Sequence, residues 1–239
     1  MDSVATEEYW NSHWLQAKFG ISPKNHPIRR WIEKEIKDTK VSTCLEIGCY
    51  PGKFLSVMGE KGYELNGIDS FKGTDLLADY FKNNGYRVGN FYEADFLNFS
   101  SQTKYDVVCS FGFIEHFENV SAILKKHLEL LKTGGMLVID VPNLNSAIYR
   151  FLYKILEPGT LENHVMTTMD LENICSELKR NGCEIRYAGY IGYFYFRYVN
   201  RHNKIQSLLA AIINLTRPFM VLLPESLYKR YIGIIAIKM

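Results

Sequence analysis

The stretch TCLEIGCYPGKFL, residues 43–55, runs from apolar residues through a glycine turn into a segment of helical character. Gly48 and Gly52 let the backbone turn sharply and approach a ligand without an intervening side chain. The spacing GCYPG (48–52) does not match the G-x-G-x-x-G pattern of dinucleotide-binding loops. Glu46 precedes the turn, where a carboxylate repels a pyrophosphate and attracts an ammonium or sulfonium group. The stretch therefore predicts a strand–turn–helix site for a ligand that carries positive charge.

Strand-like and helix-like segments alternate along the chain after this turn. Short apolar runs such as VVCSF (107–111) and MLVIDV (136–141) are typical of central strands covered on both faces. The alternation predicts parallel strands joined by right-handed crossovers. We expect strands near 43–48, 63–69, 87–93, 105–111, 135–141, 183–196 and 231–239, and helices near 6–18, 27–38, 52–61, 74–83, 119–132, 168–181 and 203–223.

The alternation of strand-like and helix-like segments ends after residue 182. Two β-rich segments, 183–196 and 231–239, flank an apolar helical insert, which predicts an antiparallel hairpin at one edge of the sheet. We therefore expect a single α/β domain over residues 1–239, Rossmann-like, with a mostly parallel seven-stranded sheet and helices on both faces. Its expected parts are an N-terminal helical lid (1–38), a cofactor-binding core (39–192), a helical insert (193–230) and the final strand (231–239).

The composition is that of an ordinary globular protein. Of 239 residues, 28 are Lys or Arg and 26 are Asp or Glu, so the formal net charge is +2, which argues against a nucleic-acid partner. Five cysteines without C-x-x-C spacing indicate reduced thiols. The N-terminus lacks the apolar core of a signal peptide, so we expect a cytoplasmic protein. The apolar segment 205–223 is interrupted by polar residues and falls short of a membrane span. It leaves open a peripheral contact with a membrane or a lipid-linked substrate.

Acidic residues also end the second and third predicted strands. Asp69, followed by Ser70, stands 21 residues after Gly48, where a carboxylate accepts hydrogen bonds from both ribose hydroxyls. Asp95 stands beside Phe96, and this pair predicts an acceptor for an adenine amino group with an aromatic cover for the ring. A helix cap remains the alternative for Asp69, and a plain strand end remains the alternative for Asp95.

These motifs resemble the class I S-adenosylmethionine (SAM)-dependent methyltransferases, in their small-molecule branch. The family loop reads E/D-x-G-x-G-x-G, and EIGCYPG (46–52) matches it except that Tyr50 replaces the middle glycine. YDVVCSFGFIEHF (105–117) resembles the fourth strand with the Glu-His pair that follows it. LKTGGMLVIDVPN (131–143) resembles the fifth strand, and residues 163–185 resemble the next histidine, helix and strand. The resemblance covers about residues 40 to 192, with the final strand added.

The resemblance implies SAM as the cofactor and methyl transfer to a small-molecule acceptor, for which we favour a hydroxyl on a sugar or a lipid-linked intermediate. It implies no metal, because metal-dependent members would have an acid just after the fourth strand, where SFG (110–112) stands. The alternatives are a nucleic-acid methyltransferase and a non-catalytic member of the fold that docks on a partner or a membrane. The residues that the resemblance assigns to the cofactor are Glu46, Gly48, Tyr50, Gly52, Asp69, Ser70, Asp95, Phe96 and Phe111.

Two histidines are the candidates for a catalytic base. His116 lies in the loop after the fourth strand, and His164 precedes the helix near 168–181. A histidine with a near-neutral pKa suits proton removal from a hydroxyl. The alternative for each is a structural side chain that bonds to nearby backbone. A lid over the cofactor is likewise the alternative to plain packing for one face of the first predicted helix, which carries Tyr9, Trp10, His13 and Trp14.

Overall fold

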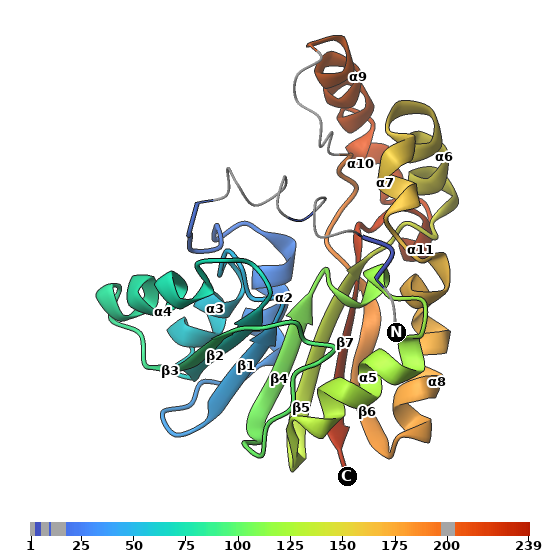
Figure 1. The fold of residues 1–239 in the computed structure, drawn as a ribbon. Helices are drawn as coiled ribbons and strands as arrows, with labels where there is room; N and C mark the ends of the chain where they lie inside the picture. Colours follow the sequence, from blue (N-terminus) through green and yellow to red (C-terminus); the bar gives the residue numbers. More distant parts are fainter. Residues whose placement is uncertain (1–2, 6–9, 11–17, 197–203) are drawn as a thin grey trace.

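The protein contains one seven-stranded sheet with helices packed on both faces (Figure 1). The computed structural model describes residues 3–5, 10, 18–196 and 204–239. In spatial order the strands are β3 (Val88–Glu93), β2 (Glu64–Asp69), β1 (Thr43–Ile47), β4 (Tyr105–Phe111), β5 (Leu131–Pro142), β7 (Tyr231–Lys238) and β6 (Cys183–Ile191).

The first five strands are parallel, and β7 runs antiparallel to both of its neighbours, β5 and β6. This arrangement confirms the predicted Rossmann-like sheet with an antiparallel hairpin at its edge. The strand order reverses direction between β1 and β4, because β2 and β3 lie on one side of β1 while β4 and β5 lie on the other.

Two buried clusters cover the two faces of the sheet and explain why its central strands are mostly apolar. One cluster joins the sheet to α2 (Pro27–Glu35), α3 (Leu55–Glu60) and α4 (Thr74–Asn83). The other joins it to α5 (Val120–Glu129), α6 (Ala147–Leu156) and α8 (Leu171–Arg180). In β4, Val107 and Val108 point into opposite clusters, as alternation along a strand requires.

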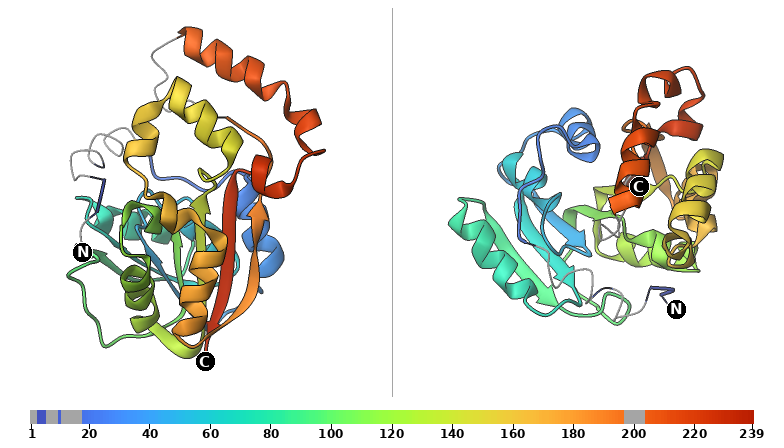
Figure 2. Two further views of the ribbon diagram at one scale, coloured as in Figure 1. Left: turned by 90° about the vertical axis from the view of Figure 1, so that its right-hand side faces the viewer. Right: turned by 90° about the horizontal axis from the view of Figure 1, so that it is seen from above.

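Several of the remaining helical elements, α7 (Pro158–Glu162), α9 (Lys204–Asn214) and α10 (Arg217–Met220), lie beyond the carboxyl ends of the parallel strands, at the top of Figure 1. In the left view of Figure 2, α9 lies at the top as well. No helix in the described ranges is long and apolar enough to cross a membrane. The other helical elements are the 3₁₀ turns η1 (Ile114–His116) and η2 (Met166–Met169), and the helix α11 (Glu225–Tyr228).

Several predicted boundaries were wrong for local reasons. The strand predicted over 183–196 ends at Ile191, because Gly192 adopts a positive φ of 89° and turns the chain away from the sheet. The helix predicted from residue 52 begins at Leu55, after a turn in which Gly52 also has a positive φ. The helix predicted over 119–132 ends at Glu129.

The C-terminal insert also differs from its prediction. The single helix expected over 203–223 is divided into α9 and α10, and Pro218, which has no N–H, lies in the first turn of α10. Helices α6 and α7 were not predicted. Residues 197–203 and most of the helix predicted over 6–18, including Tyr9, His13 and Trp14, lie outside the described residues.

Gly52 provides a test of this packing. A Cβ there would lie 2.7 Å from Leu77 and 2.9 Å from Phe81, and its φ is +89°. Gly85 has a similar φ of +80° with nothing within 4 Å of a Cβ, so it is the matched control. We expect Gly85→Ala to lower the free energy of unfolding by about 1–2 kcal/mol. Gly52→Ala should lower it by a further 1–3 kcal/mol or so, because the methyl group overpacks the core. Urea unfolding of the ligand-free variants measures both values, and equal losses would contradict this account.

Candidate active site

The candidate site lies at the carboxyl edge of the sheet, where the strand order reverses between β1 and β4. In open α/β sheets the loops on either side of this point leave toward opposite faces, and ligands bind in the crevice between them. Here the turn at 48–54 follows β1 and η1 follows β4. The ends of β2 and β5 flank these two loops on the same edge.

Gly48 allows the two loops to pack against each other. Its φ is +71°, and a Cβ at this position would lie 2.7 Å from the ring of Phe113. Its N–H donates to the carbonyl oxygen of Ile68 at 2.9 Å, which ties the turn to β2. Phe111, at the end of β4, places its ring 5.1 Å from that of Phe54 in the same turn. Phe113 was not predicted, and it occupies the space that the glycine leaves.

Asp69 organises the turn and keeps capacity for a ligand. Its Oδ2 accepts from the N–H of Tyr50 and its Oδ1 from the N–H of Phe71, each at 2.9 Å. A carboxylate has about four acceptor positions, so both oxygens can still accept hydroxyl hydrogens. Burial raises the pKa of Asp69, and these backbone bonds oppose that rise. The Tyr50 ring lies 4.3 Å from that of Phe71 and forms a wall beside the carboxylate, and Ser70 next to it is exposed.

Asp95 and Phe96 lie in different surroundings. Asp95 is exposed, and its oxygens accept from the N–H of Leu97 and the side chain of Asn98. Phe96 is only 5% exposed and packs its ring 5.1 Å from that of His127 in the core. The ring of Phe96 therefore faces the inside of the domain in this structure, and its role as an aromatic cover for adenine stays a prediction.

Three carboxyl groups are buried along the same edge: Glu46 in β1, Glu115 in η1 and Asp140 in β5. Each is at most 3% exposed, and one oxygen of each has no hydrogen-bond partner among the described residues. Loss of solvation raises the pKa of all three well above the ordinary value, and the charge of Asp140 adds to the rise for Glu46 and Glu115. A bound cation would favour their charged forms. The edge therefore fits a ligand that carries positive charge.

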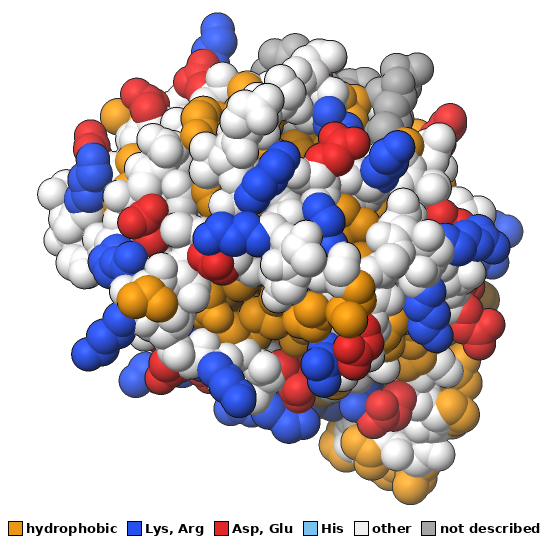
Figure 3. All heavy atoms as spheres, turned by 90° about the horizontal axis from the view of Figure 1, so that it is seen from below, with side chains coloured by type: hydrophobic (Ala, Val, Ile, Leu, Met, Phe, Trp, Pro, Cys, Tyr) orange, Lys and Arg blue, Asp and Glu red, His pale blue; other side chains and the backbone are white. Residues whose placement is uncertain are grey.

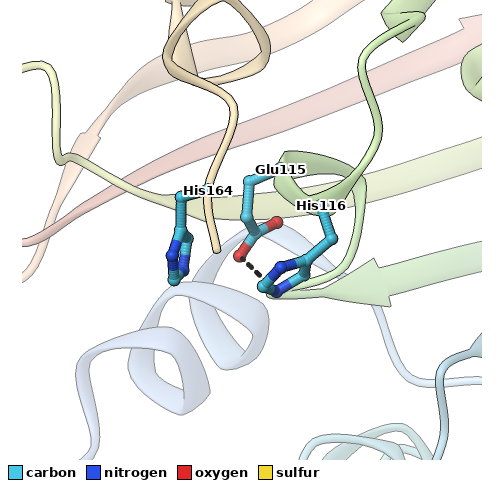
Figure 4. A group of neighbouring side chains, drawn as sticks. All are labelled: Glu115, His116 and His164. Carbon is cyan, nitrogen blue, oxygen red and sulfur yellow. Dashed lines mark ion pairs between the residues drawn. The ribbon is translucent and has the colours of Figure 1, made fainter. Parts of the chain in front are cut away.

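The two predicted histidines meet at the end of this row, although they come from separate segments. The ring centroids of His116 and His164 lie 4.7 Å apart, and Glu115 projects between them (Figure 4). The N–H of Val165 donates to the carbonyl oxygen of Glu115 at 2.7 Å and joins the two segments. Trp10 places its ring edge-on to His116, with centroids 4.7 Å apart.

Backbone carbonyls orient both imidazole rings. Nδ1 of His116 lies 2.7 Å from the carbonyl oxygen of Asn163, and Nδ1 of His164 lies 2.6 Å from that of Thr160. A carbonyl oxygen only accepts, so Nδ1 carries the hydrogen in both rings. Burial lowers the pKa of His164, and its bond to Thr160 opposes this shift.

The sequence reasoning missed Glu115 and Asp140 as site residues. Both carry a signal that could have found them. Asp140 is an acid near the carboxyl end of a buried apolar run, as Glu46 is, and Glu115 directly precedes a candidate histidine. The position that identified Glu46 therefore also identifies Asp140 in β5, and adjacency to His116 identifies Glu115.

Comparisons with known proteins agree with this geometry. Residues 22–188 match the model of a methyltransferase domain family. The ubiquinone biosynthesis O-methyltransferase of Rickettsia felis is 27% identical over 150 residues, which are 60% of each chain. The protein of the same name from Rickettsia typhi is 24% identical over 235 residues, covering 87% of this chain and 92% of the relative. The match to the first of these relatives thus spans less than two thirds of its length.

Solved structures show the same fold. YcgJ from Bacillus subtilis superposes with a TM-score of 0.60 at 14% identity, over 88% of this chain and 97% of that one. The magnesium protoporphyrin IX methyltransferase of Synechocystis, solved with S-adenosylhomocysteine (SAH), gives a TM-score of 0.55 at 15% identity, over 89% and 80%.

The residues at the edge of the sheet fit the family's cofactor. The unpartnered oxygens of the buried carboxyl groups suit its ammonium and sulfonium charges, and Asp69 has acceptor capacity for its ribose. The family match covers most of the chain, including β1 to β5 and both loops at the switch in strand order. The chain therefore belongs to the methyltransferase domain family, among the class I SAM-dependent methyltransferases.

Proposed function

We propose that this protein transfers a methyl group from SAM to a hydroxyl group of a small-molecule acceptor. The observation that carries the proposal is the pair of imidazoles with Glu115 at one end of a row of buried carboxyl groups. The row supplies a site for the positive charge of the cofactor, and the imidazoles supply groups that can receive a hydroxyl proton. Relatives named as O-methyltransferases support the choice of oxygen as the methylated atom.

Each part of the site has a separate task in this proposal. Glu46 faces the ammonium group, and Asp69 accepts from the ribose hydroxyls. His116 and His164 take the acceptor's hydroxyl proton, and the loops exclude water around them. When bound, the cofactor supplies a methyl group on a positive sulfur, so that a C–S bond breaks as a C–O bond forms and the electron pair returns to sulfur. Holding both reactants in place supplies much of the rate.

We also propose that the acceptor is presented at a membrane surface, as a lipid-linked or otherwise apolar molecule. Exposed apolar side chains are concentrated on α9, on α10 and in the turn that follows α10. Ile205 is 70% exposed, Phe219 71% and Leu222 82%. Phe151 and Ile155 on the neighbouring helix α6 are also exposed. Hydrophobic side chains gather at the corner of Figure 3 where α9 projects.

Basic side chains lie near this apolar surface and favour a membrane with anionic lipids. Arg150 and Lys154 are exposed on α6, and the Arg217 guanidinium lies 3.7 Å from the centroid of the Tyr193 ring. Basic side chains beside an apolar surface favour anionic headgroups. On the face seen in Figure 3, basic and acidic side chains are mixed. We expect the protein on the cytoplasmic side of such a membrane, where its five free thiols stay reduced.

Binding of SAH tests the cofactor site. We expect micromolar binding by calorimetric titration, no binding of NADH, and a loss of about tenfold or more in Asp69→Ala, because hydrogen bonds from ribose to a charged group are removed. Asp79→Ala, at an exposed position of α4, is the matched control and should bind like wild type. Absence of SAH binding in the folded wild-type protein would contradict the proposed function.

Glu46 predicts a dependence of stability on pH. Its pKa is raised in the folded protein above the ordinary 4.5, so above pH 4.5 the unfolded chain binds fewer protons than the folded one. The free energy of unfolding of the ligand-free protein should therefore fall as pH rises from 4.5 towards the folded pKa, by up to about 1.4 kcal/mol per pH unit from this group.

Urea unfolding at pH 5, 6 and 7 measures this slope. Glu46→Gln should make it shallower, because the amide does not titrate, whereas Glu129→Gln, at an exposed position of α5, should keep the wild-type slope. Equal slopes in wild type and Glu46→Gln would show that this carboxyl is charged in the folded, ligand-free protein.

Vesicle flotation tests the membrane contact. The protein should float with vesicles that contain phosphatidylglycerol, float less with neutral vesicles, and lose binding as salt rises. The double variant Phe219→Ser, Leu222→Ser should stay at the bottom of the gradient. The double variant Val41→Ser, Leu76→Ser removes two equally apolar, exposed side chains elsewhere and should float like wild type. Equal flotation of both double variants would remove this surface from the proposal.

A further inference from the structure

Three potential metal ligands converge at the acceptor end of the site. One ligand atom from each of Glu115, His116 and His164 lies within 4.8 Å of the other two (Figure 4). Glu115 and His116 are buried, and His164 is partly exposed. η1 supplies the first two ligands and the turn before η2 supplies the third. The bond from Val165 to the backbone of Glu115 holds these two segments together.

The orientation of both histidines is that of metal ligands. A ligating histidine usually donates its other ring N–H to a carboxylate or a backbone carbonyl, which fixes the tautomer. His116 and His164 both do so through Nδ1, to the carbonyl oxygens of Asn163 and Thr160. Nε2 is then the ligand atom of each ring, and Nε2 of His116 faces Oε1 of Glu115.

The carboxyl group does not bond directly to the imidazole that it faces. Nε2 of His116 and Oε1 of Glu115 are 4.0 Å apart, too far for a hydrogen bond. The other oxygen, Oε2, is buried without a partner among the described residues. Metal–ligand distances of about 2.0–2.2 Å place neighbouring ligand atoms about 3.0–3.4 Å apart. A contraction of this cluster around an ion would therefore give Oε2 of Glu115 the partner that it lacks among the described residues.

We propose that Glu115, His116 and His164 bind one divalent first-row transition-metal ion, of the class of Zn²⁺ and Mn²⁺. Two imidazoles favour such an ion over Mg²⁺ or Ca²⁺, which prefer oxygen ligands, and three protein ligands leave positions open for an acceptor. The absence of an acid at 110–112 led the sequence analysis to expect no metal. In the structure the acid of the cluster comes slightly later, at Glu115.

This proposal rests on the proposed function and refines the roles of the two histidines. With an ion in place they would act as ligands in place of proton acceptors, and an open position would be left for the acceptor's hydroxyl group. The positive charge lowers the pKa of that hydroxyl, and its proton leaves to solvent when the acceptor binds. The site would therefore favour acceptors with a hydroxyl that can reach the ion, in particular those with a second oxygen beside it.

Metal titration of tag-free protein stripped with EDTA tests the proposal without any acceptor. We expect Zn²⁺ to bind by calorimetry as one ion per chain, Co²⁺ to give a visible absorption band typical of nitrogen and oxygen ligands, and Mg²⁺ to bind more weakly. Glu115→Gln and His164→Ala should each weaken Zn²⁺ binding by about tenfold or more, because each removes a ligand. Circular dichroism and thermal unfolding verify that both variants are folded.

A histidine outside the cluster provides the matched control. His26 caps α2 by accepting from the N–H of Ile28, and asparagine is also a good cap, so His26→Asn removes an imidazole and keeps the helix start. This variant should bind Zn²⁺ like wild type. Zn²⁺ binding that is absent in wild type, or unchanged in both folded cluster variants, would overturn the proposal.

The same stripped protein separates this proposal from the methyltransferase function. SAH binding without Zn²⁺ binding would overturn the metal site alone, whereas Zn²⁺ binding without SAH binding would contradict the proposed function and leave the metal site standing. Once an acceptor is known, methyl transfer should fall after EDTA treatment and return on addition of Zn²⁺ or Mn²⁺. Full activity in the stripped enzyme would show that the reaction does not use the ion.

Discussion

Burial of acidic side chains at the carboxyl edge of the sheet is the constraint on which the site depends. Glu46, Glu115 and Asp140 lie on three different elements, and each has an oxygen that the described residues leave without a partner. A buried carboxyl group is costly unless it is paired or neutral. Burial therefore favours the neutral form of each group and raises the pKa of all three well above the ordinary value. A ligand that carries positive charge would favour the charged form of all three groups.

Much of the sheet could be predicted from the sequence because its signals are local. The glycine turn after β1 and the apolar runs of β4 and β5 depend on residues close together in the chain. Prediction is weakest where long-range packing decides the outcome. In the sequence Phe96 stands beside Asp95, which suggested a ring that could stack on adenine. In the structure its ring packs in the core against the rings of Phe113 and His127. Nothing near Phe96 in the chain indicates those two partners.

In the candidate site, too, features with local sequence signals could be predicted, and features that depend on long-range packing could not. Glu46 and Asp69 could be placed by counting from the glycine turn, and both stand at the predicted edge of the sheet. His116 and His164 could be named, but their meeting could not be predicted, because it depends on a backbone bond between Val165 and Glu115. Helices α6 and α7, which the sequence reasoning did not foresee, bring the segment of His164 back across the end of β4. Side chains from distant segments come together in one site only where such helices and backbone bonds bring the segments into contact.

The position of β7 between β5 and β6 has a consequence for the order of events during synthesis. The ribosome completes β6 before β7 exists, so β6 has no partner on the sheet until residues 231–238 have emerged. Until then the edge of β5 that later pairs Asp140 with Gly233 is an open row of unpaired N–H and C=O groups. The nascent chain can assemble the glycine turn and the first five strands early. β6 can join the sheet only after β7 has been synthesised, because β7 lies between β5 and β6. A chain interrupted before residue 231 would thus present an adhesive strand edge to other chains.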